Sequence, residues 1–519
     1  MRAISRRQFC CAAAAAAVPR PSVAQTLEWR LRTRDRATGQ PLITTRTLDP
    51  RQTGIVIIDM WNWHWCMTFT QRVVALVPRM NEALKAARRL GMRVIWAPTD
   101  AANHYVGWPQ RERSIGMPPY PVPKVREVSC VFSAKEGPCE CGPGIACLTD
   151  FGWDGMEPEL TIAADDWIVE GLQELYSICR ERGLRHLLYM GVATNMCLFS
   201  RPEAVKAMAS AGLDCMVARD LTEAYTRYDP AAGYTPDLGT AESVVDLERA
   251  GIPTIDMAKE MRRQGEWNPA GPLEMVHLTP WGTKQRPYLF TDAVTVTLKA
   301  VRLGKVETRC TLDGTEPGTR SLLYWEPLKV DRTTLLRAAA FERGRKVSLL
   351  SDGYFVQLGP VPPKPDVYLD QIEPLSQPPW VREPIWQPRI NRAFNGGALT
   401  IRKRAYQRGV GVTAPDHMLY AVQPAYDRFV ALTGVDDDPF RQSQEAWFLA
   451  RHCSVQFQVY IDGKLATESP VMRLSQEPWR YDVKIPQGSR RIHLVTTDAG
   501  TRSLLDLGDW VDAGFMMKK

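Results

Sequence analysis

Two hydrophobic patterns divide the 519-residue chain. In the first half, short apolar runs alternate with stretches that are apolar at helical spacing. Residues 54–59 form an almost unbroken apolar run, which is typical of a strand buried on both faces of a parallel sheet. An apolar helical face follows between Val73 and Ala87, and residues 93–97 return to the strand pattern. Strands separated by helices predict an α/β unit whose parallel sheet is covered on both faces.

Beyond about residue 284 the apolar positions take the two-residue period of strands. Residues 293–298 alternate between apolar and polar side chains, which predicts a strand with one buried face. Residues 359–365 are rich in proline and predict a stiff, extended spacer. Strand patterns then continue toward the C-terminus. The second half is therefore predicted to be all-β and to fold separately from the α/β unit.

Two residues with matched chemistry lie at strand ends in the α/β unit. Asp59 ends the apolar run, and Cys197 ends the segment Gly-Val-Ala-Thr-Asn-Met-Cys that follows a second apolar strand. Ligands of open α/β sheets bind beyond the carboxyl ends of the strands, so we expect the two side chains to share a pocket. A helix beginning at Cys197 would favour the thiolate. A neighbouring carboxylate could take the thiol proton and return it to a leaving amine.

This pair, and the segment 191–197 above all, resembles the isochorismatase-like cysteine hydrolases, which include nicotinamidase and N-carbamoylsarcosine amidohydrolase. The resemblance covers roughly the first half of the chain after residue 24. It implies a three-layer, parallel-sheet isochorismatase-like α/β domain over residues 25–262. It also implies hydrolysis of a small amide through a thioester, with no cofactor.

The resemblance assigns roles residue by residue. Cys197 matches the family's nucleophile, and Asp59 matches its general base. The family's non-proline cis peptide falls at Val192–Ala193. The backbone amides of Ala193 and Cys197 would then form the oxyanion hole.

The family's third catalytic residue is a lysine, and the sequence departs from the family at this point. Residues 159–167, where the lysine is expected, contain acids and no cation. Lys135 is the nearest lysine before Cys197, so we assign it the role as a residue reaching in from a loop. Without a cation the site would favour the neutral thiol. The alternatives are therefore an inactive glycan-binding or scaffold protein and, less favoured, ether hydrolysis of the isochorismatase type.

Aromatic residues follow Asp59 closely. Trp61, Trp63 and His64 are predicted to line the pocket, although packing at a sheet edge would explain them equally well. Asp100 and His104 lie where nicotinamidases carry a metal-binding set. Since only fragments of that set remain, we predict no metal.

Two further resemblances cover the all-β half. After an expected linker at 263–283, residues 284–358 resemble the chitobiase/hexosaminidase C-terminal domain, a small β-sandwich. After the proline-rich linker at 359–366, residues 367–519 resemble a carbohydrate-binding module of glycosidase accessory domains, a galactose-binding-like jelly roll. These resemblances imply a polysaccharide or cell-wall glycan as partner.

Possible ligand contacts in the last domain are ambiguous. An acidic turn at 436–438 either binds calcium or is simply solvated. Tryptophans are available to stack on sugars, but most tryptophans of this kind are core residues. They are Trp380, Trp386, Trp447, Trp479 and Trp510.

The N-terminus and the charge bear on location and partners. Residues 1–24 carry Ser-Arg-Arg-x-Phe, an alanine-rich run and a small-residue cleavage site, which predict twin-arginine export to the periplasm or the exterior. The net charge of +7 includes four arginines of this segment, and the nearly balanced remainder argues against nucleic-acid binding. No other stretch is apolar enough to span a membrane. Relatives of the α/β domain often self-associate, so a homo-oligomer is possible.

A cysteine cluster lies in a loop that contains glycine and proline. Disulfides or free thiols are favoured there over a zinc site, because the spacing lacks paired Cys-x-x-Cys knuckles. The cluster comprises Cys130, Cys139, Cys141 and Cys147.

Overall fold

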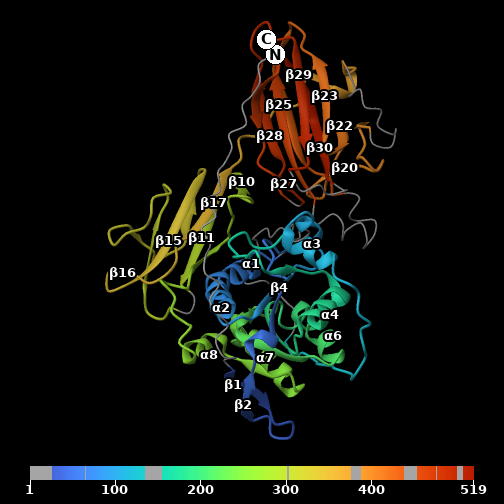
Figure 1. Ribbon diagram of the computed structural model, residues 1–519. Coiled ribbons are helices and arrows are strands. Elements are labelled where there is room, and N and C mark those ends of the chain that lie inside the picture. Colours follow the sequence, from blue (N-terminus) through green and yellow to red (C-terminus); the bar gives the residue numbers. More distant parts are fainter. Residues whose placement is uncertain are drawn as a thin grey trace, which may run out of the picture.

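The computed structural model describes residues 26–64, 66–134, 153, 155–300, 303–375, 387–437, 453–474, 476–499 and 506–519. These residues form an α/β unit and two β-sandwich units (Figure 1). No helix in the described ranges has the length and apolarity needed to cross a membrane. The expected export segment, Lys135 and three of the four clustered cysteines lie outside the described residues.

The first unit, called the hydrolase-like unit below, is built on a mixed eight-stranded sheet in the order β2-β1-β8-β7-β6-β3-β4-β5. Strands β3 to β8 pair in parallel, while β1 runs antiparallel to both of its neighbours. The strands are β1 (Leu27–Arg34), β2 (Pro41–Leu48), β3 (Thr53–Ile58), β4 (Arg93–Ala97), β5 (Trp167–Ile168), β6 (His186–Val192), β7 (Asp214–Glu223) and β8 (Thr254–Ile255). The helices are α1 (Met67–Val74), α2 (Val77–Arg89), α3 (Pro109–Ile115), α4 (Gly171–Arg182), α5 (Cys197–Ser200), α6 (Val205–Ser210), α7 (Pro236–Arg249) and α8 (Met257–Arg263).

Helices cover both faces of this sheet, as the apolar run of β3 predicted. Ile55 and Ile57 pack into one core with residues of α2 and α8. Val56 and Ile58 point the other way and pack with residues of α4 and α6. The three-layer α/β prediction is therefore confirmed.

Two local features differ from the sequence expectation. The sequence pattern over residues 168–179 predicts a helix, but α4 begins only at Gly171, because Trp167 and Ile168 pair with β4 as a short strand. Strands β1 and β2 form a hairpin that the hydrophobic pattern did not reveal, since every residue of β2 before Leu48 is exposed.

The second unit is a β-sandwich of two sheets, in the orders β10-β17-β15-β12-β13 and β14-β11-β9. Its strand β9 (Val276–Thr279) lies inside the range expected to be a linker and pairs with β11, so this unit begins earlier than the composition indicated. The other strands are β10 (Tyr288–Phe290), β11 (Val294–Ala300), β12 (Glu307–Thr311), β13 (Leu322–Leu323), β14 (Leu328–Val330), β15 (Thr334–Glu342), β16 (Arg345–Lys346) and β17 (Ser351–Gln357).

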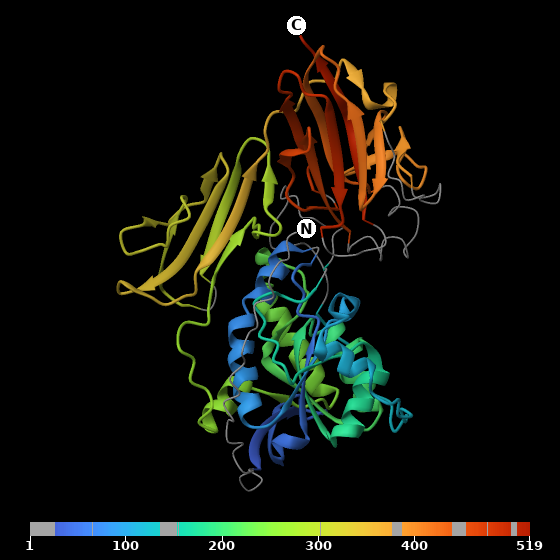
Figure 2. The same cartoon turned by 45° about the horizontal axis from the view of Figure 1, so that its top comes forward.

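The third unit is a larger sandwich, seen at the top of Figure 2. Its two main sheets run in the orders β19-β22-β30-β24-β28 and β23-β29-β25-β26. Trp510 is fully buried between them and packs edge-on to Phe457, so it is a core residue and not a sugar platform. The strands are β18 (Val367–Tyr368), β19 (Arg389–Ile390), β20 (Leu399–Ile401), β21 (Arg404–Tyr406), β22 (Gly409–Thr413), β23 (Asp416–Ala421), β24 (Tyr426–Val435), β25 (Ser454–Ile461), β26 (Lys464–Glu468), β27 (Met472–Arg473), β28 (Trp479–Lys484), β29 (Arg491–Thr497) and β30 (Leu507–Met517).

The first two units are joined by more than a linker, through a contact between α1 and β9 that we call the junction. The Gln71 amide donates to the Leu278 carbonyl and accepts from its N–H at 2.7 Å. The Met67 sulfur accepts from the Trp281 backbone N–H at 2.8 Å. Trp63 and Trp281 stack with ring centroids 6.0 Å apart. All these side chains are buried, so the second unit is docked firmly on the helix that follows β3.

Candidate functional site

Asp59 and Cys197 lie beside each other at the carboxyl edge of the sheet. Strands β3 and β6 are parallel neighbours, with Ile58 opposite Gly191. A Cβ atom at Gly191 would lie 2.0 Å from the Ile58 carbonyl oxygen, and the residue takes a φ of 105°. Only glycine allows this close approach. It brings the end of β3 against the turn that carries Cys197.

The turn presents backbone N–H groups to the sulfur. The Val192–Ala193 peptide bond is cis, and Cys197 is the first residue of the four-residue helix α5. The Ala193 backbone N–H is hydrogen-bonded to the Cys197 sulfur. The N–H groups of Met196 and Leu198 both donate to the Ala193 carbonyl, at 3.0 and 3.1 Å. The turn is thereby closed tightly around the thiol.

Asp59 is fully buried and held on both carboxylate oxygens. Its Oδ1 accepts the Thr99 backbone N–H at 3.0 Å, and its Oδ2 accepts the Arg201 Nε at 3.1 Å. The carboxyl is also hydrogen-bonded to the Cys197 thiol. Asp59 takes a φ of 47°, a left-handed conformation that is uncommon for residues other than glycine. The carboxyl is thus oriented by its neighbours and directed at the sulfur.

Arg201 is the cation that the sequence analysis did not identify. Its guanidinium joins Asp59 to Asp100, whose Oδ2 lies 3.0 Å from Nη2. Its backbone N–H donates to the Cys197 carbonyl at 3.1 Å. The four-residue spacing was the available signal, since positions i and i+4 share a helix face. The family's lysine is expected upstream of the cysteine, whereas the structure places a cation downstream of it.

The electrostatics of the site favour a neutral thiol at rest. Burial and the adjacent Asp59 charge raise the pKa of Cys197 to about 12, although Arg201 acts in the opposite direction. Burial also raises the pKa of Asp59, partly offset by Arg201 and the thiol hydrogen bond. Burial alone would lower the pKa of Arg201, but the charges of Asp59, Cys197 and Asp100 raise it above its usual value. The expected thiolate at a helix N-terminus is not favoured, because α5 is short and burial dominates.

A second buried acid lies behind Asp59. The Thr99 hydroxyl donates to Glu203 Oε1, while its backbone holds Asp59. Burial, opposed by the Thr99 bond and reinforced by Asp59, raises the pKa of Glu203 to about 7. Glu203 therefore holds a proton to a higher pH than an exposed glutamate does.

The predicted pocket residues divide between two places. Trp61 stacks on Trp153 at 4.7 Å and on His64 at 5.3 Å. His64 Nδ1 accepts the Cys66 backbone N–H at 3.0 Å, which leaves the ring proton on Nε2. This aromatic group packs in the same core as Ala193 and Cys197. Trp63 instead lies in the junction, between Trp281 and the Arg286 guanidinium.

The residues considered for metals and disulfides are placed as follows. Asp100 pairs with Arg201, and in the described part of the chain no group of three His, Cys, Asp or Glu residues is arranged to hold a metal ion. Cys130 is a free, partly buried thiol. Asp436 and Asp437 are buried, and Asp437 accepts the Lys403 backbone N–H at 2.6 Å, so this acidic turn is not simply solvated.

Comparison with protein-family models identifies the two β-rich units. Residues 288–351 match the Chitobiase/beta-hexosaminidase C-terminal domain, and residues 365–516 match the NPCBM/NEW2 domain. A family 51 carbohydrate-binding module from Clostridium perfringens, solved in complex with methyl-galactose, is 25% identical with a TM-score of 0.25. That match covers 29% of this chain and 99% of the module.

The N-terminal region has curated and structural relatives of its own. It is 27% identical over 173 residues to ureidoacrylate amidohydrolase RutB from Klebsiella pneumoniae (strain 342), covering 30% of this chain and 67% of the relative. A cysteine hydrolase from Pseudomonas syringae is 15% identical with a TM-score of 0.27, covering 42% of this chain and 96% of that protein. The resemblances predicted from sequence are confirmed: an N-terminal unit similar to isochorismatase-like hydrolases precedes a unit matching the chitobiase/β-hexosaminidase C-terminal domain and one matching NPCBM/NEW2.

Proposed function

We propose that the hydrolase-like unit is a cysteine-dependent hydrolase of small amides, in which Arg201 takes the place of the family's lysine. One observation carries the proposal. A buried carboxyl, a partly buried thiol and a guanidinium meet at the carboxyl edge of the sheet, and the carboxyl contacts both of the others. General base, nucleophile and cation are the groups that cysteine-dependent acyl transfer needs.

In the first half of the reaction, the Cys197 sulfur attacks the amide carbonyl carbon as the thiol proton passes to Asp59. Because the pKa of Cys197 is about 12, this proton leaves during the attack and not before it. The carbonyl oxygen becomes an oxyanion, and the N–H groups of Ala193 and Cys197 are assigned to bind it. The C–N bond then breaks, the leaving nitrogen takes the proton from Asp59, and a thioester remains on Cys197.

In the second half, water resolves the thioester. Asp59 accepts a proton from the water as its oxygen attacks the thioester carbon. The C–S bond breaks, and the proton returns from Asp59 to the Cys197 sulfur, so the carboxylic acid leaves and the resting site is restored. Arg201 stabilises the charge that alternates between Asp59 and Cys197 in both halves.

The proposal also covers the location of the protein and the partner of its C-terminal units. Residues 1–24 direct export by the twin-arginine route, and the two C-terminal units hold the hydrolase-like unit to a polysaccharide or cell-wall glycan. The matched domain families favour glycan attachment. Since the curated relative is named for ureidoacrylate, this compound and simple primary amides are the first substrates to test.

The central prediction concerns the thiol. Cys197→Ser should lower amide hydrolysis by about 1,000-fold or more, because a buried hydroxyl is a far weaker nucleophile. Release of the amine from ureidoacrylate and a panel of small amides measures the effect. Cys130→Ser is the matched control, because Cys130 is also a free thiol with a pKa raised by burial to about 12. This variant should keep the native rate. Undiminished turnover in Cys197→Ser would remove the thiol from the mechanism.

The high pKa of Cys197 favours one other function, a glycan-binding scaffold whose hydrolase-like unit is inactive. The two are separated by trapping the thioester. Brief mixing with an active amide followed by acid quench should show the acyl mass on the peptide containing Cys197. A native protein that neither hydrolyses any panel amide nor forms the adduct would be the scaffold.

A further inference from the structure

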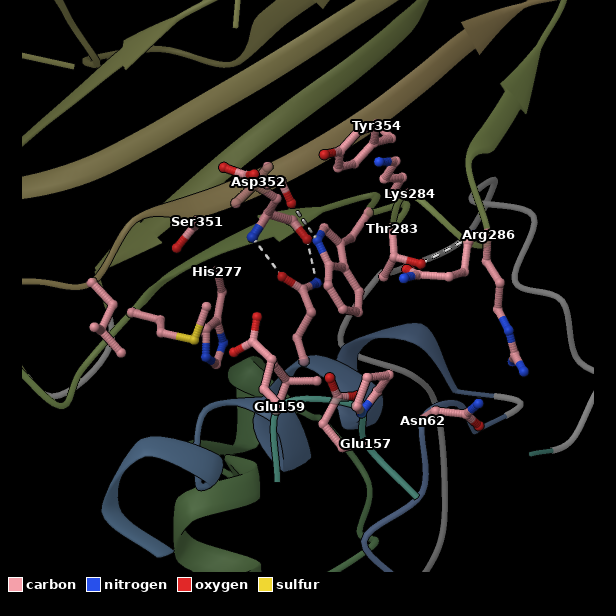
Figure 3. A pocket seen from close by; sticks show the side chains of 18 of the residues that line it. Asn62, Glu157, Glu159, His277, Thr283, Lys284, Arg286, Ser351, Asp352 and Tyr354 are labelled. Atoms are coloured by element: carbon pink, nitrogen blue, oxygen red, sulfur yellow. Dashed lines mark hydrogen bonds between the residues drawn. The ribbon is translucent and has the colours of Figure 1, made fainter. Parts of the chain in front are cut away.

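A cavity of about 790 Å³ lies where the three units meet. Figure 3 shows Asn62, Glu157 and Glu159 of the hydrolase-like unit facing His277 and Asp352 of the second unit across it. Arg473 of the third unit also lines it, whereas Asp59, Cys197 and Arg201 do not. Ligand sites commonly have volumes of about 300–1,000 Å³ and often lie at domain interfaces. We call this space the junction cavity.

The walls of the junction cavity are held by buried contacts. Gln71, on one wall, is bonded to the backbone of Leu278 on the other. The indole N–H of Trp281 donates to the Asp352 carbonyl at 2.8 Å, which fixes a further part of the lining. Contacts between the docked units therefore fix part of the cavity lining before a ligand binds.

The charges around the cavity are mixed. Its acids are Glu157, Glu159 and Asp352, and its bases include Lys284, Arg286 and Arg473. Burial and the nearby Glu159 raise the pKa of Glu157 to about 8, so this carboxyl is largely protonated at pH 7 and donates as well as accepts. Asp352 is paired with Arg337 at 3.2 Å. With Glu157 protonated, two charged acids stand against three bases, so the net charge of the lining is small and favours an anion only weakly.

The lining instead offers many kinds of hydrogen-bonding group beside aromatic rings. Side-chain amides, hydroxyls, imidazoles, carboxyls and guanidinium groups all face the cavity, and so do Trp281 and Tyr354. Sugar hydroxyls both donate and accept, so they match a lining of both kinds. The C–H face of a sugar ring can pack on an aromatic side chain. An uncharged ligand with many hydroxyls fits this chemistry better than an apolar or an ionic one.

We propose that the junction cavity binds an uncharged saccharide through its hydroxyl groups. The inference does not depend on turnover by Cys197, and it places a sugar site beside the hydrolase-like unit, apart from whatever the third unit binds. A glycan held there would contact all three units at once.

Isothermal titration calorimetry on the full chain tests the proposal. The uncharged probes are N,N′-diacetylchitobiose, cellobiose and methyl-galactose, and the charged ones are glucosamine and glucuronic acid. We expect at least one uncharged probe to bind. Glu157→Leu should weaken that binding at least tenfold, or remove one binding site per chain if the third unit binds the same sugar. Tyr354→Phe, which removes only a hydroxyl and keeps the shape, should weaken it by a smaller factor.

The matched control is Glu112→Leu, which removes an exposed glutamate of the same unit outside the cavity and should bind as the native chain does. Near-native melting temperatures show that each variant is folded. The proposal is overturned if no uncharged probe binds the native chain, or if Glu157→Leu and Tyr354→Phe both keep native affinity and stoichiometry. Tighter binding of either charged sugar than of every uncharged one would also overturn it.

Discussion

A buried arginine and a partly buried one lie near the carboxyl edge of the same sheet, and their surroundings differ. Arg72 of α1 pairs with the fully buried Glu223 at 3.0 Å, with its guanidinium 5.3 Å from the Phe69 ring centroid. Arg201 joins two acids, Asp59 and Asp100, and lies within electrostatic reach of the Cys197 thiol. Asp59 and Asp100 both take left-handed backbone conformations, with φ of 47° and 67°.

The comparison separates a structural ion pair from the ion pair that we assign to the proposed reaction. The charges of Arg72 and Glu223 balance each other, which is what a buried pair needs to be tolerated. Around Arg201 the acids outnumber the cation, and the pKa values of Asp59, Cys197 and Glu203 are all raised. Groups in this situation have perturbed pKa values and are candidates for proton transfer. The same residue type at the same edge therefore fills two roles.

The largest expected effect is on activity, and it tests the difference between Arg201 and Arg72. Arg201→Met should reduce amide hydrolysis by about 100-fold to 10,000-fold, because the charge alternating between Asp59 and Cys197 loses its counter-ion. Steady-state kinetics on an active amide measure the loss, which should fall mainly on kcat. A variant that turns over at the native rate would leave the site without an identified cation.

The next effect is on stability. Arg72→Met should lower the free energy of unfolding by about 3–5 kcal/mol, because the buried Glu223 loses the guanidinium paired with it. Chemical denaturation measures it. Arg201→Met should cost less in the same measurement, since its side chain is 22% exposed against 9% for Arg72. Equal destabilisation of the two variants would break the distinction.

The third prediction concerns pH. Burial raises the pKa of Glu203 from 4.5 to about 7, so the folded state favours the protonated form. The stability it contributes is full below pH 4.5 and is lost as the pH rises through 7. Glu203→Gln stays neutral at both pH values. From pH 5 to pH 8 its free energy of unfolding should therefore fall less than that of the native chain does, by up to about 3 kcal/mol. Denaturation at both pH values, with Glu112→Gln as control, measures the difference; parallel slopes in all three proteins would contradict it.

The smallest effect tests whether charge or shape matters at Arg201. Arg201→Lys keeps a positive charge but loses the planar fork that joins Asp59 to Asp100. We expect about a tenfold loss in kcat/KM, which is milder than for Arg201→Met. A lysine variant as inactive as the methionine variant would show that bridging the two acids is essential.

Much of the fold could be predicted from local sequence patterns. The apolar run before Asp59 predicted β3, and the absence of alternating polar residues predicted that both faces of this strand are buried. The cis bond observed at Val192–Ala193 lies where the family resemblance implied it. The hairpin of β1 and β2 was not predicted, because the exposed edge strand β2 carries no hydrophobic signal, although β1 alternates between buried and exposed residues.

The site was only partly predictable, for a physical reason. Asp59 and Cys197 could be paired because parallel strands end at the same sheet edge. Arg201 is indicated only by its four-residue spacing from Cys197, whereas the family resemblance implies a lysine upstream of the cysteine. Trp61 and Trp63 are two residues apart and were predicted to line the same pocket, yet Trp63 packs on Trp281 in the junction. The spacing of the tryptophans does not indicate where the second unit docks. Lys135 stays an untested assignment.

The docking of α1 on β9 has a consequence for how the protein loses its structure. Trp63, Met67 and Val74 of the hydrolase-like unit belong to one continuous apolar cluster with the interiors of both sandwiches. Cutting the chain after residue 262 would expose that surface to water, so we expect the isolated hydrolase-like unit to be less stable than the same unit in the full chain. The three units should unfold in one cooperative transition. Replacing the second unit with an unrelated β-sandwich should lower the stability of the hydrolase-like unit that packs against it.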